Sequence, residues 1–409
     1  MHNENVLITL LHITTVPESL GFLTGQAGYM RARGIETIGL SSPGTLLTHF
    51  AQNEQVPVYA VQMPRRITPL RDLVTIFKVC RVIRRVNPNV VHGYTPKGGL
   101  LGMISARLMQ VPVPIYHVLG LPFMTATGLK RQILRWTEQI ACRLALQVFC
   151  VSHSVRDILI TEGLCPADKV KVLANGSING VDSSKRFNPA RLEPAARQAT
   201  RARYQIPDSA IVIGFLGRIV RDKGLIELTQ AWQMLKSQWT DLHLLIVGQF
   251  EPHDPLPAAV EEIMRSDPAI HLTGYVDEIV DLYQAMDLLV LPTYREGFPV
   301  VPLEAAAMRL PVIATQIPGC SEAVADGVTG RLVPPYDALA LAEATQTYLN
   351  DPELRVRHGQ NGRERVIQNF RPELIWEATY QEYLRLLQSK GINPPRLTVH
   401  ETQPLSANS

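Results

Sequence analysis

Two glutamates eight positions apart, Glu296 and Glu304, are the residues of this 409-residue sequence that first suggest chemistry. Glu296 lies in a Gly-Phe-Pro turn after a strand-like run, and Glu304 lies on a helix-like run of leucine and alanine. A carboxylate on such an apolar helix needs a polar partner, and the hydroxyls of a sugar or ribose provide one. The helix dipole alone explains Glu296 but not Glu304, so the pair predicts a site that binds hydroxyl groups.

A second group of residues is cationic. Arg218 and Lys223 follow a strand-like run and a turn at Gly217, and they stand just before a helix, in GFLGRIVRDKG (214–224). Free amides and the dipole at a helix N-terminus favour anions, and a guanidinium chelates two oxygens. This segment therefore predicts a diphosphate site, and a solvated basic loop is the alternative.

Two further turns are weaker candidates. Gly21, in SLGFLTG (19–25), lets the backbone approach a ligand closely, although neither GxGxxG nor GxxxxGK[ST] is present and an ordinary turn fits equally well. His92 and Lys97 lie at the carboxyl end of another strand-like run, before a Gly-Gly helix start. A phosphate of an acceptor could dock there, and an ordinary turn remains the alternative.

Strand-like and helix-like runs that alternate along the chain must position these residues. Such alternation indicates parallel sheets covered by helices on both faces. It is interrupted over residues 183–208, which are polar, basic and proline-containing, and it restarts at 211–218. We therefore predict an α/β protein with two Rossmann-like domains, the first over 1–190 and the second over 205–372.

The same pattern predicts the individual elements. The expected strands are 6–13, 36–42, 89–94, 114–120, 147–152, 243–248, 270–274, 287–292 and 311–315. The expected helices are 25–34, 70–88, 99–110, 129–145, 225–238, 257–267, 278–286, 352–369 and 372–389. Helix 374–390 is expected to complete the first domain, and 391–409 reads as a disordered tail.

Composition limits the compartment and the partners. The five cysteines form no CxxC pair, which is typical of a reduced protein, and the N-terminus lacks the basic region of a signal peptide. We therefore expect a cytoplasmic protein with no spanning helix. Residues 1–190 carry 20 Lys and Arg against 10 Asp and Glu, whereas the remainder carries 20 against 27. The first half should therefore face something anionic.

The basic excess is concentrated in helix 70–86 and the two arginines before it. This helix has apolar residues at helical spacing among its arginines and lysine, so residues 65–86 predict a helix that lies on an anionic membrane surface, with 129–145 extending the patch. A solvated charged face is the alternative. Nucleic acid is not expected, because no groove-reading or aromatic motif accompanies the charge.

The spacing of Glu296 and Glu304 resembles the E-x7-E signature of family 4 nucleotide-sugar glycosyltransferases, which have the GT-B fold of two Rossmann-like domains that face each other across a cleft. GRIVRDKG, LLIVG, HLTGYVDEIVDLYQAMDLLVLPT and PVIAT follow in the family's order, and VVHGYTPKGG and VLANGSINGVD resemble the branch that builds capsule, O-antigen and lipid-linked glycans. The resemblance covers residues 5–388.

This resemblance implies roles for the candidate residues. Arg218 and Lys223 would hold the donor diphosphate, Glu304 the ribose, and Glu296 the transferred sugar. The further donor-binding positions that it implies are Gly21, Gly217, Gly248, Tyr275, Val276, Gly297, Phe298, Pro299 and Val300, with backbone near Tyr275–Val276 meeting the base. Pro299 is expected in the first turn of the helix that carries Glu304, which leaves the amides near Phe298–Val301 unpaired.

One position departs from the family pattern. Where many members have a cleft histidine this chain has Leu119, and His117 lies two residues earlier. Residues i and i+2 share a face of a strand, so His117 is a substitute candidate for catalysis, and an ordinary strand histidine is an equal alternative.

The family resemblance implies a retaining glycosyltransferase. It would move a hexose or N-acetylhexosamine from a UDP-sugar to a polyprenyl-diphosphate-linked sugar, at the inner face of the cell membrane. No DxD triplet occurs, so neither a metal nor another cofactor is expected. A non-catalytic sugar-nucleotide-binding scaffold and a glycoside hydrolase remain as alternatives.

Overall fold

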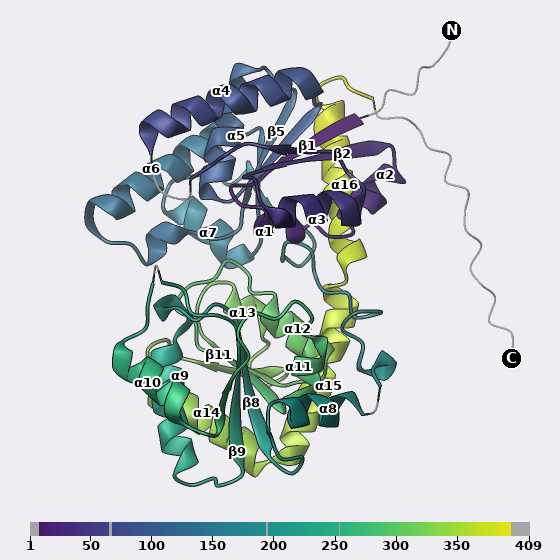
Figure 1. Cartoon of the computed structure of the whole chain (residues 1–409). Coiled ribbons are helices and arrows are strands. Elements are labelled where there is room, and N and C mark those ends of the chain that lie inside the picture. Colours follow the sequence, from purple (N-terminus) through teal and green to yellow (C-terminus); the bar gives the residue numbers. More distant parts are fainter. Residues whose placement is uncertain (1–7, 65–67, 194, 253, 394–409) are drawn as a thin grey trace, which may run out of the picture. The chain divides into compact units, whose positions relative to one another are not determined.

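The computed structural model of the protein describes residues 8–64, 68–193, 195–252 and 254–393 (Figure 1). The chain forms two compact units, one made of residues 1–116, 144–146 and 379–409 and the other of 117–143 and 147–378. It contains two parallel sheets with helices, which confirms the fold class expected from the alternating runs. The predicted bounds of 1–190 and 205–372 stay predictions, and the predicted tail lies outside the described residues from 394 onward.

The first sheet has seven strands in the order β3-β2-β1-β4-β5-β6-β7. Their bounds are β1 (Ile8–Ile13), β2 (Ile35–Ser41), β3 (Val58–Ala60), β4 (Val90–Tyr94), β5 (Val113–Val118), β6 (Gln147–Cys150) and β7 (Val170–Val172). Every residue of β4, β5 and β6 is buried, as expected for parallel strands covered on both faces. The strand order reverses between β1 and β4, so the loops after these two strands are neighbours.

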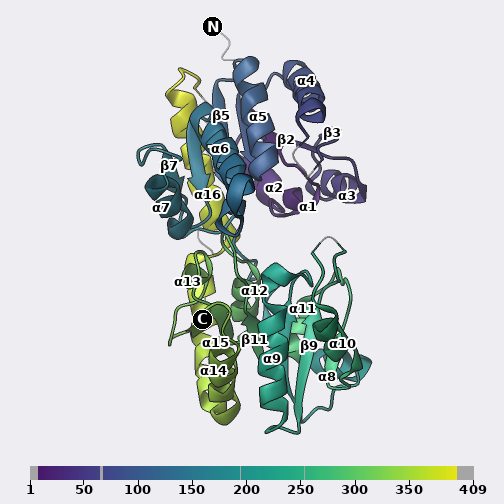
Figure 2. The ribbon, with the colours of Figure 1, turned by 90° about the vertical axis from the view of Figure 1, so that its left-hand side faces the viewer.

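Eight helices accompany this sheet within the described residues. They are α1 (Glu18–Gly21), α2 (Gln26–Arg31), α3 (Thr45–Glu54), α4 (Pro69–Val86), α5 (Pro96–Leu108), α6 (Gly128–Leu144), α7 (His153–Thr161) and α16 (Pro372–Gln388). The long helix α4 packs along α5 (Figure 2). It begins at Pro69 and ends before Asn87, whose backbone is left-handed, so its bounds lie within two residues of the helix predicted over 70–88.

The second sheet has six strands in the order β10-β9-β8-β11-β12-β13. Their bounds are β8 (Ile211–Leu216), β9 (Leu242–Val247), β10 (Ile270–Leu272), β11 (Leu288–Leu291), β12 (Val312–Thr315) and β13 (Gly330–Val333). Strand β8 pairs with both β9 and β11, so the order reverses between β8 and β11. In sheets of this kind ligands bind at the carboxyl ends of the strands where the order reverses.

Helices pack on both faces of this second sheet. They are α8 (Ala196–Arg203), α9 (Leu225–Lys236), α10 (Ala258–Ser266), α11 (Val280–Ala285), α12 (Val301–Ala307), α13 (Cys320–Ala323), α14 (Ala338–Asn350) and α15 (Pro352–Asn369). Helix α9 packs against α14 and α10, whereas α12 packs against α15 and α11 against α8. The loops at the carboxyl edge are therefore carried by a framework with a core on each face.

The basic segment expected at the domain boundary contains helix α8, and one of its arginines is a core residue. Arg201 is fully buried and pairs with Asp287 at 2.9 Å, while its remaining donors bind backbone carbonyls, among them that of Ala285. A buried guanidinium is tolerated when its charge and its N–H groups all have partners. Part of the basic excess in this segment is thus structural.

None of the described helices combines the length and the apolar character that crossing a membrane requires.

Candidate functional site

The predicted cationic loop and the predicted glutamate loop meet at the carboxyl edge of the second sheet. Strand β8 is followed by 217–224 and β11 by 292–300, and since these strands pair, their loops are adjacent. Lys223 Nζ forms an ion pair with Glu296 Oε1, and both side chains are mostly buried. The backbone amide of Tyr294 also donates to Asp222 O at 2.9 Å, which ties the two loops together.

Arg218 lies at the same edge but has a different partner. Its guanidinium is exposed and donates to the Glu251 carboxylate at 3.2 Å. Gly217, just before it, lies against Gly248, where a Cβ atom would come within 1.9 Å of the Gly217 carbonyl oxygen. The loops after β8 and β9 therefore approach each other backbone to backbone, and only glycine fits at 248. Arg218 thus follows a tightly packed turn, and its side chain is exposed.

Glu304 lies in the first turn of α12, and its partner is a tyrosine. The Tyr283 hydroxyl, from α11, donates to Glu304 Oε2 at 2.6 Å. Burial raises the pKa of the Glu304 carboxyl above its usual value, and the Tyr283 hydrogen bond and the charge of Arg186 oppose that rise. Burial also raises the pKa of Tyr283, so its hydroxyl stays a proton donor. This hydrogen bond holds the Glu304 carboxylate in a fixed orientation in the first turn of α12.

The helix that carries Glu304 starts later than the sequence suggests. Helix α12 begins at Val301, so Pro302 and not Pro299 occupies its first turn. The prediction for Pro299 was wrong because a proline two residues into the helix satisfies the same backbone preference. Phe298 and Pro299 are buried in the loop before the helix, and Val300 is its N-cap. These residues shape the loop backbone next to Glu296.

Tyr275 and Val276 follow β10, and the structure brings them to Gly248. The amide of Gly248 donates to Gly274 O at 3.1 Å, which joins the loops after β9 and β10. The Tyr275 side chain is exposed beside this contact. The predicted donor-binding positions from Gly217 to Glu304 thus occupy the loops after β8, β9, β10 and β11 and the first turn of α12.

The remaining candidates lie on the first sheet. His117 is buried in β5 with its ring edge-on to Phe149, and burial lowers its pKa to about 3. Strand β5 ends at Val118, so the argument that His117 and Leu119 share a strand face does not hold. The imidazole of His117 is neutral at physiological pH, which leaves it as a neutral hydrogen-bonding group.

His92, Lys97 and Gly21 have different surroundings. His92 is buried in β4, where its Nδ1 lies 2.6 Å from the Tyr383 hydroxyl and 2.9 Å from the Tyr94 hydroxyl. Lys97, at the start of α5, pairs with Asp72 of α4 at 2.7 Å. Gly21 lies in α1 with open space where a side chain would begin. Their roles in ligand binding stay predictions.

Sequence reasoning missed several residues of the second-sheet site. Tyr283 was visible only as part of an amphipathic helix, and nothing in the sequence paired it with Glu304. Glu227 and Tyr294 form another carboxylate–hydroxyl pair near Lys223, and Arg295 donates to Asp222 at 3.0 Å. The signal that could have found Arg295 and Asp222 is their position in the same two loops as Glu296 and Lys223.

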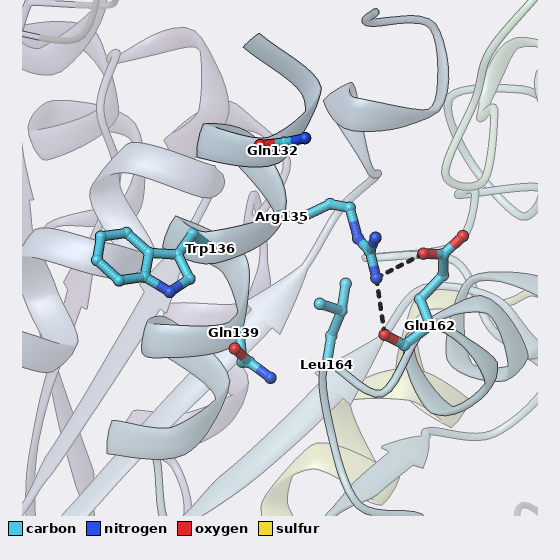
Figure 3. Close-up of a pocket in the computed structure, with 6 residues that line it drawn as sticks. All are labelled: Gln132, Arg135, Trp136, Gln139, Glu162 and Leu164. Carbon is cyan, nitrogen blue, oxygen red and sulfur yellow. Dashed lines mark hydrogen bonds and ion pairs between the residues drawn. The ribbon is translucent and has the colours of Figure 1, made fainter. Parts of the chain in front are cut away.

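A separate hollow of about 200 Å³ lies between α6 and the segment after α7 (Figure 3). None of the candidate catalytic, donor-binding or acceptor-binding residues lines it, although α6 belongs to the predicted membrane-facing segment 129–145. Arg135 donates to the Glu162 carboxylate and carbonyl on one side of α6, while Trp136 points to the other side (Figure 3). The hollow is lined by Gln132, Arg135, Trp136, Gln139, Glu162 and Leu164.

Comparison with known proteins gives two family matches. Residues 196–365 match the model described as "Glycosyl transferases group 1", and residues 22–176 match "Glycosyl transferase 4-like domain". The capsular polysaccharide biosynthesis glycosyltransferase CapM of Staphylococcus aureus is 33% identical over 384 residues, which are 93% of this chain and 98% of that protein. The UDP-Gal:alpha-D-GlcNAc-diphosphoundecaprenol alpha-1,3-galactosyltransferase of Escherichia coli is 24% identical over 327 residues, 79% of this chain and 82% of that protein.

Solved structures share the fold. A glycosyltransferase from Rickettsia africae superposes with a TM-score of 0.77 at 22% identity, covering 94% of this chain and 99% of that one. Anabaena HepE in complex with UDP-glucose superposes with a TM-score of 0.75 at 19% identity, covering 92% and 99%.

Proposed function

Because this chain belongs to the family 4 glycosyltransferases of the GT-B fold, in the branch of capsule and lipid-linked glycan assembly, we propose that it uses a UDP-sugar as donor. It transfers a hexose or N-acetylhexosamine, with retention at the anomeric carbon, to a polyprenyl-diphosphate-linked sugar during assembly of a surface polysaccharide. The observation that carries this proposal is the pairing of Lys223 with Glu296 one loop away from Glu304. A cation that can bind the diphosphate, Lys223, then lies along the same sheet edge as two carboxylates that can bind hydroxyls, Glu296 and Glu304.

The donor diphosphate binds Lys223 and Arg218. Both cations can turn from their carboxylate partners, Glu296 and Glu251, to a ligand, and Arg218 is exposed enough to do so without unfolding its loop. Positive charge held there stabilises the negative charge that develops on the leaving diphosphate. Released from Lys223, Glu296 accepts hydrogen bonds from hydroxyls of the transferred sugar.

The nucleoside binds at the neighbouring loops. The second oxygen of the Glu304 carboxylate accepts a ribose hydroxyl while Tyr283 holds the first. The base lies at the junction of Gly248 with Tyr275 and Val276, where Gly248 N bonds to Gly274 O and the Tyr275 side chain is exposed. The charge of the diphosphate is balanced by Arg218 and Lys223, and since the chain has no DxD triplet, we expect turnover without an added metal.

The relatives support this donor and acceptor. The Escherichia coli relative is named for UDP-galactose and a diphosphoundecaprenol-linked acceptor, and a Campylobacter jejuni relative is named for a diphospho-undecaprenol-linked sugar. The name of the Staphylococcus aureus relative supports capsular polysaccharide as the product class.

Thermal stabilisation of the purified protein tests the donor site directly. A ligand that binds only the folded state raises the Tm. We expect UDP, but not GDP, ADP or NAD, to raise it, and we expect Glu304→Ala and Arg218→Ala to abolish the rise. An equal shift with GDP or ADP would contradict the choice of UDP, and no shift with any nucleotide would contradict the transferase proposal.

Two helices support contact with an anionic membrane at the cytoplasmic face. Helix α4 buries Thr75, Val79 and Ile83, and its other side exposes apolar residues. These residues, Leu70, Leu73, Val74 and Phe77, are between 55% and 84% exposed. Exposed basic residues continue the same surface toward the helix C-terminus: Lys78, Arg81, Arg84 and Arg85. Arg65 and Arg66, also predicted to contribute, lie outside the described residues.

Helix α6 has the same character on its exposed side. Leu129 and Trp136 are 71% and 70% exposed and lie two turns apart, with Ile133 between them and Lys130 and Arg143 on the same helix. An amphipathic helix with basic and large apolar exposed residues binds anionic interfaces by charge and by insertion. The alternative, a helix face that is only solvated, would explain the basic residues but not the exposed Leu129 and Trp136.

Flotation with lipid vesicles tests this contact. The protein should float with phosphatidylglycerol-containing vesicles and not with pure phosphatidylcholine vesicles. Leu73→Ser with Phe77→Ser should weaken flotation, while Met234→Ser, which removes an exposed apolar residue from α9, should not. Equal flotation of wild type and the double variant would contradict insertion of α4.

A further inference from the structure

Helix α7 holds the loop that carries Glu296. Ser152 is completely buried at the N-cap of α7. Its Oγ accepts a hydrogen bond from Val155 N at 3.2 Å and donates one to the Gly297 carbonyl at 2.8 Å. A hydroxyl has one proton to donate, so these two bonds fix its orientation. The start of α7 therefore fixes the carbonyl one residue after Glu296.

A second set of contacts holds α7 itself. The Glu322 carboxylate accepts hydrogen bonds from the amides of His153 (2.7 Å) and Ser154 (2.9 Å) at the helix N-terminus, where the dipole favours negative charge. Ser154 Oγ donates to the same carboxylate at 2.6 Å and accepts from Gly319 N at 3.0 Å. Arg365 of α15 donates to the Glu322 carbonyl at 2.6 Å. The Gly319 amide in the loop after β12 and the Glu322 carboxylate in α13 thus anchor α7.

The Glu296 loop has no room to move toward its neighbours. A Cβ on Gly297 would come 1.9 Å from Leu119 O, and one on Gly319 would come 2.3 Å from Gly297 O. On the far side the Phe298 ring packs against the Phe370 ring, with centroids 5.6 Å apart. Backbone, helix N-cap and aromatic ring therefore confine this loop from several directions.

We infer that Ser152, Ser154 and Glu322, together called the loop clamp, are positioning residues that orient the Glu296–Phe298 loop toward the donor sugar. This inference rests on the proposed function. The C=O of one residue and the N–H of the next point in opposite directions in a trans peptide, so a fixed Gly297 carbonyl aims the Phe298 N–H the other way. Within the described residues that N–H has no acceptor, so it can bind an oxygen of the donor sugar.

The loop clamp predicts a split between nucleotide and sugar. Ser152→Ala and Glu322→Gln should bind UDP as wild type does, because UDP contacts other loops. The gain in affinity from UDP to UDP-glucose should be lost, and kcat/KM for the donor should fall about ten- to a hundredfold, as small misplacements of reacting groups do. Ser152→Thr keeps the hydroxyl and should recover most of the loss.

Asp351→Ala is the matched control. Asp351 caps α15 through Leu354 N at 2.8 Å, so this variant loses a helix cap of the same kind at a place where no donor loop is touched. It should lower the Tm to a similar extent and leave the ratio of UDP-glucose to UDP affinity unchanged. A wild-type affinity ratio and kcat/KM in Ser152→Ala would overturn the positioning role.

Hydrogen exchange of the ligand-free protein separates this inference from the proposed function. Amides in 294–301 should exchange faster in Ser152→Ala and Glu322→Gln than in wild type or Asp351→Ala. Unchanged exchange would overturn the loop clamp whatever the substrate is. If the two variants exchange faster but the wild-type protein binds no nucleotide, the proposed donor is overturned and the loop clamp still stands.

Discussion

The two sheets reverse their strand order in the same way, at β1–β4 and at β8–β11, yet the loops at these two places have different chemistry. At the first, Thr15 Oγ1 lies 2.8 Å from Thr95 Oγ1 and accepts from Gly98 N at 2.8 Å, so hydroxyl and backbone groups close the gap. At the second, the Tyr294 amide donates to Asp222 O at 2.9 Å, and an ion pair between Lys223 and Glu296 joins the same two loops. Backbone groups meet at both edges, and the second edge adds a pair of opposite charges.

The two edges differ in whether their charged residues are available to a ligand. At the β8–β11 edge the charged groups Lys223 and Glu296 bind each other and can be exchanged for those of a ligand, which fits the charged and hydroxyl-rich donor that we propose. At the β1–β4 edge the nearest cation, Lys97, is already paired with Asp72 of α4 at 2.7 Å. That edge is linked through one ion pair to the exposed apolar helix α4, which fits an acceptor that arrives from a membrane.

The largest effect is expected from Lys223→Ala. Removing this cation leaves Glu296 unpaired and takes away charge that stabilises the leaving diphosphate, so kcat/KM should fall about 10²–10³-fold. Steady-state kinetics with the donor measure this loss. Lys236→Ala is the control, because Lys236 also pairs with a carboxylate, Asp267, at 2.6 Å in the same unit. A loss no larger than that of the control would break the contrast between the two edges.

Glu304→Gln should separate stability from function. Burial raises the pKa of Glu304, so the folded protein binds this proton more tightly than the unfolded chain and stability falls as pH rises past the usual value of 4.5. Glutamine removes that penalty, so the variant should melt higher than wild type at pH 7 and lose this advantage below about pH 4. Nucleotide affinity should nevertheless fall about ten- to a hundredfold, since a hydrogen bond to a charged group is lost.

Asp267→Asn provides a control of opposite sign. The pKa of Asp267 is lowered by its hydrogen bonds to Lys236 and Trp232, although burial opposes this, so its charge stabilises the fold at neutral pH. Asp267→Asn should therefore melt lower than wild type at pH 7. If Glu304→Gln also melted lower than wild type at pH 7, the inference that the charged Glu304 carboxylate destabilises the fold would be wrong.

The alternation of strands and helices was predictable because buried parallel strands are nearly continuous apolar runs. Strands such as 243–248 and helices such as 352–369 were placed within one or two residues of their observed bounds. Strands β3, β7 and β13 were not predicted. They have three or four residues each and are not fully buried, so they show neither a long apolar run nor a regular alternation.

The site was predictable where chain position decides proximity. Lys223 and Glu296 each follow a strand at the reversal point, so their meeting follows from topology. The partners of Glu304 and Gly297, Tyr283 and Ser152, could not be paired from sequence because helix packing brings them together. The prediction that His117 and Leu119 share a strand face failed because β5 ends at Val118, one residue before Leu119. The sequence does not show where the strand ends.

A moderate effect is expected at the other edge. Lys97→Met should raise KM for the lipid-linked acceptor about tenfold if Lys97 binds its phosphate, since charge-assisted bonds to phosphate are of this strength. UDP affinity should not change. Arg107→Met removes an exposed cation from the same helix, α5, and should leave both constants unchanged. An increase in the KM of the donor instead would show that the two edges are not separate in function.

The smallest effect is expected at His117, and it sharpens the comparison by its pH dependence. Burial lowers the pKa of His117 to about 3, so the ring is neutral throughout the working range and kcat/KM should show no inflection from it near pH 6.5. The unfolded chain binds this proton more readily than the folded one. The stability contributed by the neutral ring is therefore complete above pH 6.5 and is lost as pH falls toward 3.

His117→Gln tests both statements. Its pH–rate profile should have the same shape as that of wild type, and its Tm should fall less steeply between pH 6.5 and 4. A loss of about 10² or more in kcat together with a missing inflection would identify His117 as a general acid or base, because groups in that role contribute on this scale. The β5 end would then carry catalysis on the first sheet, and the division into a donor edge on the second sheet and an acceptor edge on the first would have to be redrawn.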